Sequence, residues 1–154
     1  LHSTSRRQRQ MCIRDRSETK KTDAATTNEV VAYLIRRTER RINQSEAVIK
    51  ERMESLTSDF NGQFEWDAEA IYKHNLRLDY FRNLRATLAE EGCDNDRAKF
   101  LLKHSVEHLA DDIMMCDPYR DSSNPAANLA HRWEYEAKKE IRGIIINMIG
   151  SISE

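Results

Sequence analysis

The C-terminal part of the chain carries the clearest hydrophobic pattern. From Leu129 to Ile152, apolar residues recur at steps of three or four, which is the spacing of one face of an α-helix. Asn124 and Pro125 precede this pattern and give a strong start signal, because asparagine caps helices and proline fits their first turn. The pattern therefore predicts an amphipathic helix over 124–151. Its stripe consists of Leu129, Trp133, Ala137, Ile141, Ile144, Ile145, Met148 and Ile152.

Three further helices are predicted upstream, over 28–58, 67–91 and 95–116. The second has a wide apolar stripe and is expected to be central, and Asp117-Pro118 ends the third. Asn61-Gly62 is interpreted as a turn, and the aromatic residues around it are expected to form a loop that plugs one end of the bundle. The sequence thus predicts an all-α fold, namely a four-helix antiparallel bundle with a long first helix. The aromatic residues of the loop are Phe60, Phe64 and Trp66.

The first predicted helix has a thin apolar seam. Ile35, Ile42 and Ile49 are seven residues apart, as in a coiled coil, and Leu56 continues the series. The second heptad position is polar, because Thr38, Ser45 and Arg52 occupy it. A bundle helix with one narrow buried face is therefore favoured over a true coiled coil.

The first 21 residues are set apart by composition. The string from Arg9 to Arg16, RQMCIRDR, resembles translated sequencing-library adapter. Residues 1–21 are therefore interpreted as a disordered basic tail of non-native, adapter-derived origin, and residues 22–154 as the helical bundle domain. The alternative is a native basic tail that contacts nucleic acid or an acidic membrane.

The charge of the remaining chain argues against nucleic acid as the main partner. The whole chain has a net charge of −1, and the segment up to Lys21 carries +5, which leaves −6 for the rest. A mildly acidic body lacks the basic face that nucleic-acid binders need. No apolar run reaches the ~20 residues of a membrane span. Cys93 and Cys116 lie ~35 Å apart at the two ends of one predicted helix, so free thiols and a cytoplasmic location are expected.

One motif could bind a metal ion. His104 and His108 stand in the pattern H-x-x-E-H, which places both rings on the same side of a helix. The string resembles the zinc site of inverzincin metallopeptidases, which implies two histidine ligands and Glu107 as the base. The spacing also resembles one element of hemerythrin-like bundles, and His131 and Glu134 on the next helix could lie at the same height. Both histidines fall on the flank of their helix, so ordinary surface histidines and no cofactor are favoured.

The remaining features favour binding over catalysis. Arg36, Arg37, Arg40 and Arg41 form a basic cluster that could contact phosphates, but interleaved glutamates favour a solvated face. The sequence has no Gly-rich phosphate loop and no recognisable nucleophile site. The leading hypothesis is thus a non-enzymatic helical interaction or structural module. The alternatives are a metal-binding four-helix bundle that uses the histidine pair and a nucleic-acid-associated accessory protein.

Self-association is the expected form of this interaction. Apolar residues from Ile144 to Ile152 span an arc of ~200°, about twice what a peripheral bundle helix needs. Ile146 in particular points away from Trp133 and Ile144. A homo-oligomer or a complex with another helical protein is therefore predicted, and no membrane partner. The predicted interface residues are Ile146, Ile149, Ile35, Ile42 and Ile49.

Overall fold

The protein is an all-α bundle. The computed structural model describes the backbone over residues 5–152 and the side chains over residues 29–152. Within this part the chain forms four α-helices and no strand: α1 (Ser5–Ser58), α2 (Phe60–Leu88), α3 (Asn95–Met115) and α4 (Pro125–Gly150). The prediction of a four-helix antiparallel bundle with a long first helix is confirmed. The predicted tail over residues 1–21 has its side chains outside the described residues.

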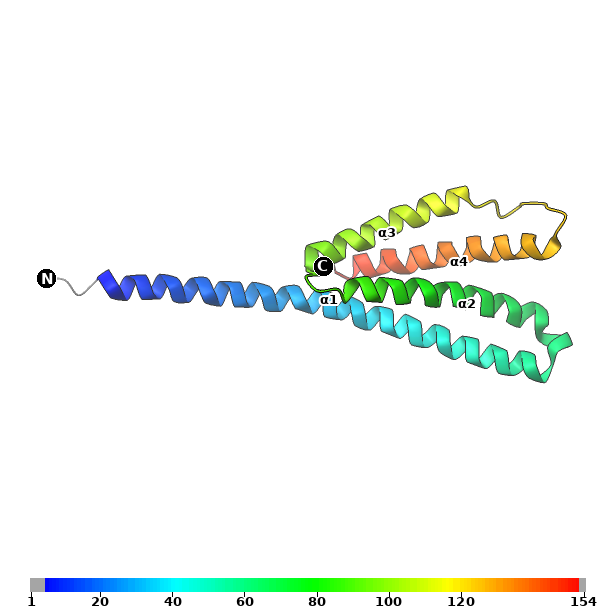
Figure 1. Cartoon of the computed structure of the whole chain (residues 1–154), viewed down its shortest axis with the longest axis horizontal. Helices are drawn as coiled ribbons and strands as arrows, with labels where there is room; N and C mark the ends of the chain where they lie inside the picture. The colour runs from blue at the N-terminus through cyan, green and yellow to red at the C-terminus, as the bar shows by residue number, and fades with distance from the viewer. Residues whose placement is uncertain (1–4, 153–154) are drawn as a thin grey trace.

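The bundle consists of two helical hairpins. α1 packs along α2, α3 packs along α4, and contacts between α2 and α4 join the two hairpins. The α1–α2 connection at Asp59 and the α3–α4 connection at 116–124 lie at the same end, and the hairpins diverge toward it (Figure 1). We call this the open end. The opposite end, with the α2–α3 connection at 89–94 and the end of α4, is the closed end.

The helix starts are set by capping side chains. Asn124 accepts hydrogen bonds from the amides of Ala126 and Ala127, so the predicted start of α4 is confirmed. Asp94 caps α3 in the same way, through the amide of Arg97 at 2.8 Å. After α2 ends at Leu88, Gly92 adopts a φ of 82° and turns the chain back.

The predicted start of α2 at Asp67 is wrong. The helix begins at Phe60, and its N-cap is Asp59, whose side chain accepts a hydrogen bond from the amide of Gly62 at 3.1 Å. Gly62 permits this approach because a Cβ at that position would collide with the Asp59 carboxylate. Asn61-Gly62 is therefore part of the first helical turn rather than a loop.

The apolar core lies toward the closed end. α1 contributes Val31 and Leu34, and the predicted stripe of α4 is buried from its middle to its end. Among the members of the core cluster on α2, α3 and α4, only Leu109 lies in the half of its helix that points toward the open end. The other core members are Phe81, Leu84, Leu88, Ala98, Leu102, Ile141, Ile145 and Met148.

No helix in the described part of the chain is both long and apolar enough to cross a membrane.

Toward the open end the interior becomes polar. Thr38 and Ser45, at the polar heptad position of α1, are both buried. The Thr38 hydroxyl donates to the carbonyl of Ile35, and the Ser45 hydroxyl lies 3.3 Å from His74 Nδ1 on α2. Because these groups have partners, their burial costs little. The polar heptad position, and not the isoleucine seam, thus provides the most buried side chains of α1 beyond Leu34.

Candidate interaction surface

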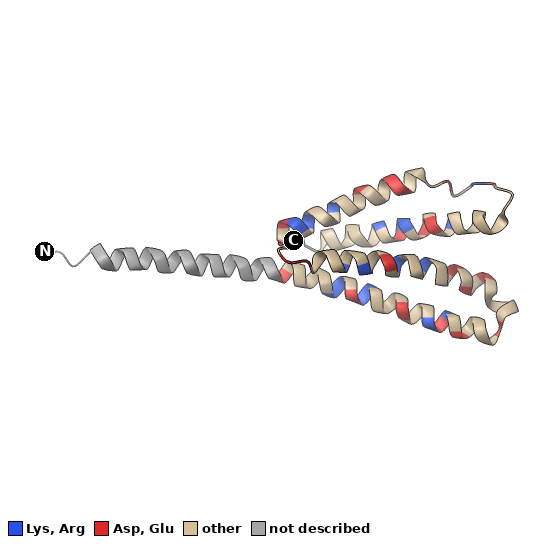
Figure 2. Cartoon of the chain, in the orientation of Figure 1, with Lys and Arg blue, Asp and Glu red and all other residues tan. Residues whose placement is uncertain are grey.

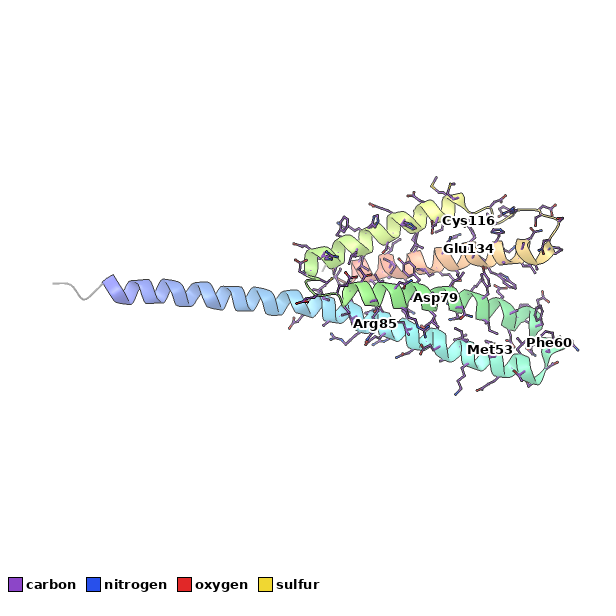
Figure 3. The ribbon with its side chains drawn as sticks, viewed as in Figure 1. Met53, Phe60, Asp79, Arg85, Cys116 and Glu134 are labelled. Atoms are coloured by element: carbon purple, nitrogen blue, oxygen red, sulfur yellow. The ribbon has the colours of Figure 1, made fainter. Side chains whose placement is uncertain are left out.

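Large apolar side chains are exposed mainly at the open end. Of the ten exposed residues of this kind among the described side chains, eight lie in the half of the bundle toward this end. The two exceptions are Phe100 and Ile146, which lie toward the closed end. Figure 3 labels Met53 and Phe60 of the open-end set. Exposed apolar side chains that gather on one part of a protein mark interaction sites more often than single scattered ones do. The eight are Met53, Phe60, Phe64, Trp66, Met114, Met115, Tyr119 and Leu129.

Three aromatic residues form the tip of the α1–α2 hairpin. The rings of Phe60 and Phe64 are 5.2 Å apart and inclined by 43°. Trp66 follows and is 70% exposed. The expectation that these residues plug the bundle end is wrong. They lie on the first two turns of α2, which extend beyond the packed part of the bundle, so their rings face solvent.

An apolar groove runs next to this tip. It has a volume of about 460 Å³ and lies between α1, α2 and α4. Within its lining, the rings of Tyr72 on α2 and Trp133 on α4 are 5.8 Å apart and connect the two helices. Burial and the nearby charge of Glu134 raise the pKa of Tyr72, so its phenol is neutral. The groove is lined by Met53, Leu56, Ala68, Ile71, Tyr72, Asn75, Leu76, Asp79 and Trp133.

The open end is also acidic. Residues 51–70 contain six acids and one arginine, a net charge of −5. Residues 111–132 contain four acids and two arginines, a net charge of −2. Figure 2 shows acidic residues along both hairpin tips. The ion pairs found among the described side chains do not involve Glu51, Glu54 or Glu65.

Ion pairs hold the helices together beside the groove. Lys73 on α2 pairs with Glu136 on α4 and with Glu69. Burial alone would lower the pKa of Lys73. Its hydrogen bonds to the two glutamates outweigh this effect, so the pKa is raised overall and the ammonium stays charged. Arg77 on α2 pairs in the same way with Glu140 on α4. These contacts fix α2 against α4 where the apolar core is thin.

The candidate metal-binding residues of the alternative hypothesis have separate contacts, apart from His108 and Glu134. His104 is exposed and stacks on Phe100, with ring centroids 5.9 Å apart. His131 lies 3.2 Å from a guanidinium nitrogen of Arg120. Over the side chains that the structure describes, no group of three or more metal-ligating residues converges.

His108 and Glu134 do belong to one network. His108 Nδ1 lies 3.7 Å from Asp112, and Lys138 pairs with Asp112 at 3.5 Å and with Glu134 at 2.8 Å. Burial alone would lower the pKa of Lys138. The hydrogen bond to Glu134 and the nearby negative charges outweigh this effect, so the pKa is raised overall. The cation between these two carboxylates is therefore the ammonium group of Lys138.

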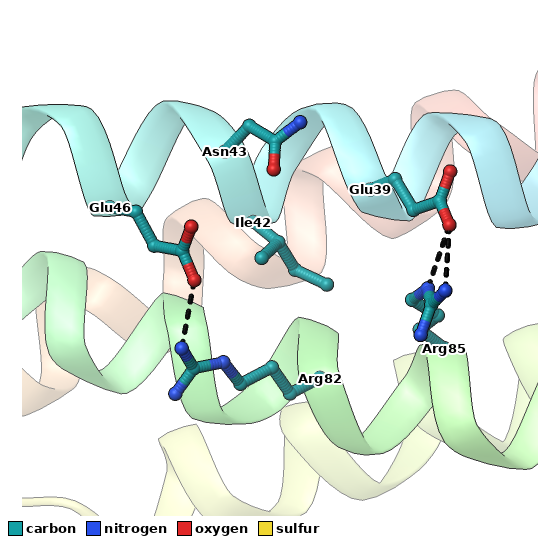
Figure 4. A pocket seen from close by; sticks show the side chains of 6 residues that line it. All are labelled: Glu39, Ile42, Asn43, Glu46, Arg82 and Arg85. Carbon is teal, nitrogen blue, oxygen red and sulfur yellow. Dashed lines mark hydrogen bonds and ion pairs between the residues drawn. The ribbon is translucent and has the colours of Figure 1, made fainter.

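Four of the five predicted interface residues already have neighbours within the chain. Ile35, Ile42 and Ile149 pack partly against the core, and Ile49 is half-buried. Ion pairs from α1 to α2 flank Ile42 on both sides, Glu39 with Arg85 and Glu46 with Arg82 (Figure 4). Only Ile146, which is 43% exposed, faces solvent to a large extent.

The arginine cluster considered for phosphate contacts lies on the surface of α1. Arg37 lies over the ring of Tyr33 at 5.8 Å, and Arg41 donates to the side chain of Gln44. Arg36 and Arg40 are exposed.

The two described cysteines, Cys93 and Cys116, flank α3 and are free thiols.

The amino-acid sequence alone does not reveal the open end as a candidate site. The aromatic residues around Asn61-Gly62 stand out in the sequence, but their burial depends on how far α2 extends.

No family model matches the chain, and no curated protein or solved structure is significantly similar to it.

Proposed function

We propose that this chain is a non-enzymatic helical interaction module that binds another protein through its open end. The observation that carries the proposal is the separation of two kinds of apolar residue along the bundle. The buried ones lie toward the closed end, and the exposed ones gather at the open end. The closed end supplies stability, and the open end presents apolar surface that a partner would cover.

Energetics support a binding role for this surface. Covering one large apolar side chain contributes about 1.5–3 kcal/mol. Trp66 and the Phe60–Phe64 pair are aromatic, and aromatic residues contribute much of the affinity in protein interfaces. The groove beside them offers a concave apolar surface on a framework held by ion pairs.

The other two functions have less support. In the metal-binding bundle, Lys138 would have to leave Asp112 and Glu134 before a cation could take its place. For nucleic acid, the cluster of arginines on α1 is accompanied by Glu39, which pairs with Arg85. Self-association through Ile146 concerns the closed end and is a separate proposal.

A selection experiment tests the location of the binding surface. A library of displayed helical peptides is selected against the full chain, and each binder is measured against two triple variants. The open-end variant carries Phe60→Ser, Phe64→Ser and Trp66→Ser. The control variant carries Phe100→Ser, Arg40→Ser and Glu91→Ser, all exposed positions outside the open end.

We expect most binders to lose at least tenfold in affinity for the open-end variant and to change less than twofold for the control. Both variants should keep the helical circular dichroism of the unmodified chain, because the replaced side chains are exposed. Binders that are indifferent to the open-end variant would contradict the proposal.

A further inference from the structure

We infer that the groove at the open end accepts a cationic amphipathic helix from a partner protein. This inference rests on the proposed function and specifies the chemistry of the partner. It is carried by the shape and lining of the groove together with the charge around it.

The lining of the groove suits the apolar face of a helix. Seven of its nine residues are apolar or aromatic, and they come from three helices that run side by side. Met53 and Leu56 line it from α1, Trp133 lines it from α4, and the other six residues belong to α2. A partner helix would bind with side chains at steps of three and four, which is how amphipathic helices occupy apolar grooves. Met53 is half-exposed, and its flexible side chain can adapt to different apolar surfaces.

The polar positions at the edge of the groove are acidic or neutral. Asp79 and Asn75 line it on α2, and both are exposed. Glu54 follows Met53 and lines the adjoining hollow at the end of α1, which also contains Lys50. The ion pairs within the described side chains leave Glu54 and Asp79 available. Lysine or arginine residues that flank the apolar face of a helix would therefore meet carboxylates.

The same charge selects between possible occupants. The two hairpin tips together carry −7, whereas the other described residues of 29–152 carry +3. A second copy of the chain docked open end to open end would place −7 against −7, which is repulsive. Anionic lipid surfaces and nucleic acids would be repelled for the same reason. A cationic helix is the occupant that both the apolar lining and the acidic edge favour.

Binding can be measured with the two native tryptophans. Trp66 and Trp133 are the chain's only tryptophans, and both lie at the open end. The probes are two 18-residue peptides with leucine at steps of three and four. One carries lysine at the remaining positions, and the other carries glutamate. A third peptide has the leucine–lysine composition in an order without amphipathic spacing. None of them contains tryptophan.

We expect the leucine–lysine peptide to shift the tryptophan emission and to bind at least tenfold more tightly than the other two at low salt. The difference from the glutamate peptide should shrink as salt is added, because exposed charges are screened. Equal affinities for the lysine and glutamate peptides, or no binding of either, would overturn the inference.

Matched variants place the peptide on the structure. Glu54→Lys with Asp79→Lys should weaken the leucine–lysine peptide at least tenfold. Glu91→Lys with Glu107→Lys makes the same charge change at exposed positions away from the groove and should weaken it less than threefold. Equal losses in the two double variants would show a general charge effect and overturn the inference.

A methionine pair tests the apolar contact. Met53 lines the groove, whereas Met115 is 89% exposed at the end of α3 and outside the groove. Met53→Ser should weaken the peptide at least fivefold, and Met115→Ser less than twofold. Selected displayed peptides that depend on the open end but carry acidic flanks would overturn this inference and leave the proposed function standing. Peptides that are indifferent both to the open-end variant and to Met53→Ser would overturn both.

Discussion

The carboxylate of Asp67, which has no exposed surface, lies 3.3 Å from the guanidinium group of Arg52 across the α1–α2 hairpin. Only one carboxylate oxygen is engaged. The other oxygen and Arg52 Nε are buried, with no hydrogen-bond partner among the described residues. On α1, Arg52 follows Thr38 and Ser45 at the same polar heptad position, so the pair continues this series of polar contacts toward the open end. A buried charge that is only partly satisfied makes the stability of the open half depend on its single partner.

Removal of one partner should therefore cost more than removal of both. Arg52→Met leaves Asp67 buried without a counterion, and we expect the free energy of unfolding to fall by about 1–3 kcal/mol. Arg52→Met with Asp67→Leu removes both charges and should recover most of that loss. Urea denaturation of both variants, of Asp67→Leu and of the unmodified chain gives the coupling energy. Additive losses would show that the two side chains do not depend on each other.

The fold was predictable where the signals are local. Asn124-Pro125 marks the start of α4 within two residues, and the stripe that contains Ile141 and Ile145 specifies its buried face. The second helix was harder because Asp59 and Asp67 are chemically equivalent caps. The choice depends on Gly62, which lets Asp59 approach, and on Arg52, which is distant in sequence and holds Asp67 inside the hairpin.

The candidate site was not predictable for a related reason. Hydrophobicity shows that Phe64 and Phe81 are both apolar, but not which end of the bundle is packed. That depends on contacts between hairpins, which bury Phe81 and leave Phe64 in solvent. The polar heptad position of α1 was recognised, but its burial required partners such as His74 on another helix.

The two halves of the bundle should differ strongly in their contribution to stability. Phe81 and Phe64 lie on the same helix and differ in exposure, 0% against 51%. Phe81→Ala should lower the free energy of unfolding by about 3–5 kcal/mol, because it leaves a cavity in the core. Phe64→Ala should change it by less than about 0.5 kcal/mol. Urea denaturation measures both, and similar losses would show that the open end is packed.

Acid should destabilise the hairpin through His74. Burial and then the charges of Arg77 and Arg52 lower the pKa of His74 below its ordinary value of 6.5. Ser45 and Arg52 face it from α1, Arg77 lies next to it on α2, and Glu140 on α4 pairs with Arg77. Below pH 6.5 the unfolded chain takes up the proton first, so stability falls until the lower pKa of the folded state is reached.

His74→Gln removes this titration but keeps a hydrogen-bonding side chain near Ser45. We expect thermal melts of the unmodified chain to lose stability between pH 7.5 and pH 5 by more than those of the variant. Other groups that titrate in this interval affect both chains equally and cancel in the comparison. A pH dependence that is unchanged by the substitution would assign the effect to other groups.

Self-association through the end of α4 is the last prediction. Ile146 is 43% exposed, whereas its neighbour Ile145 is fully buried. We expect a homodimer in light scattering at tens of micromolar, with Ile146 at or near the contact. Ile146→Arg should give a folded monomer, because a charge in an apolar contact disfavours association. Ile145→Arg is the matched comparison and should unfold the chain, because it places the charge in the core. A monomeric unmodified chain would refute the dimer, and unfolding of Ile146→Arg would show that this side chain belongs to the core.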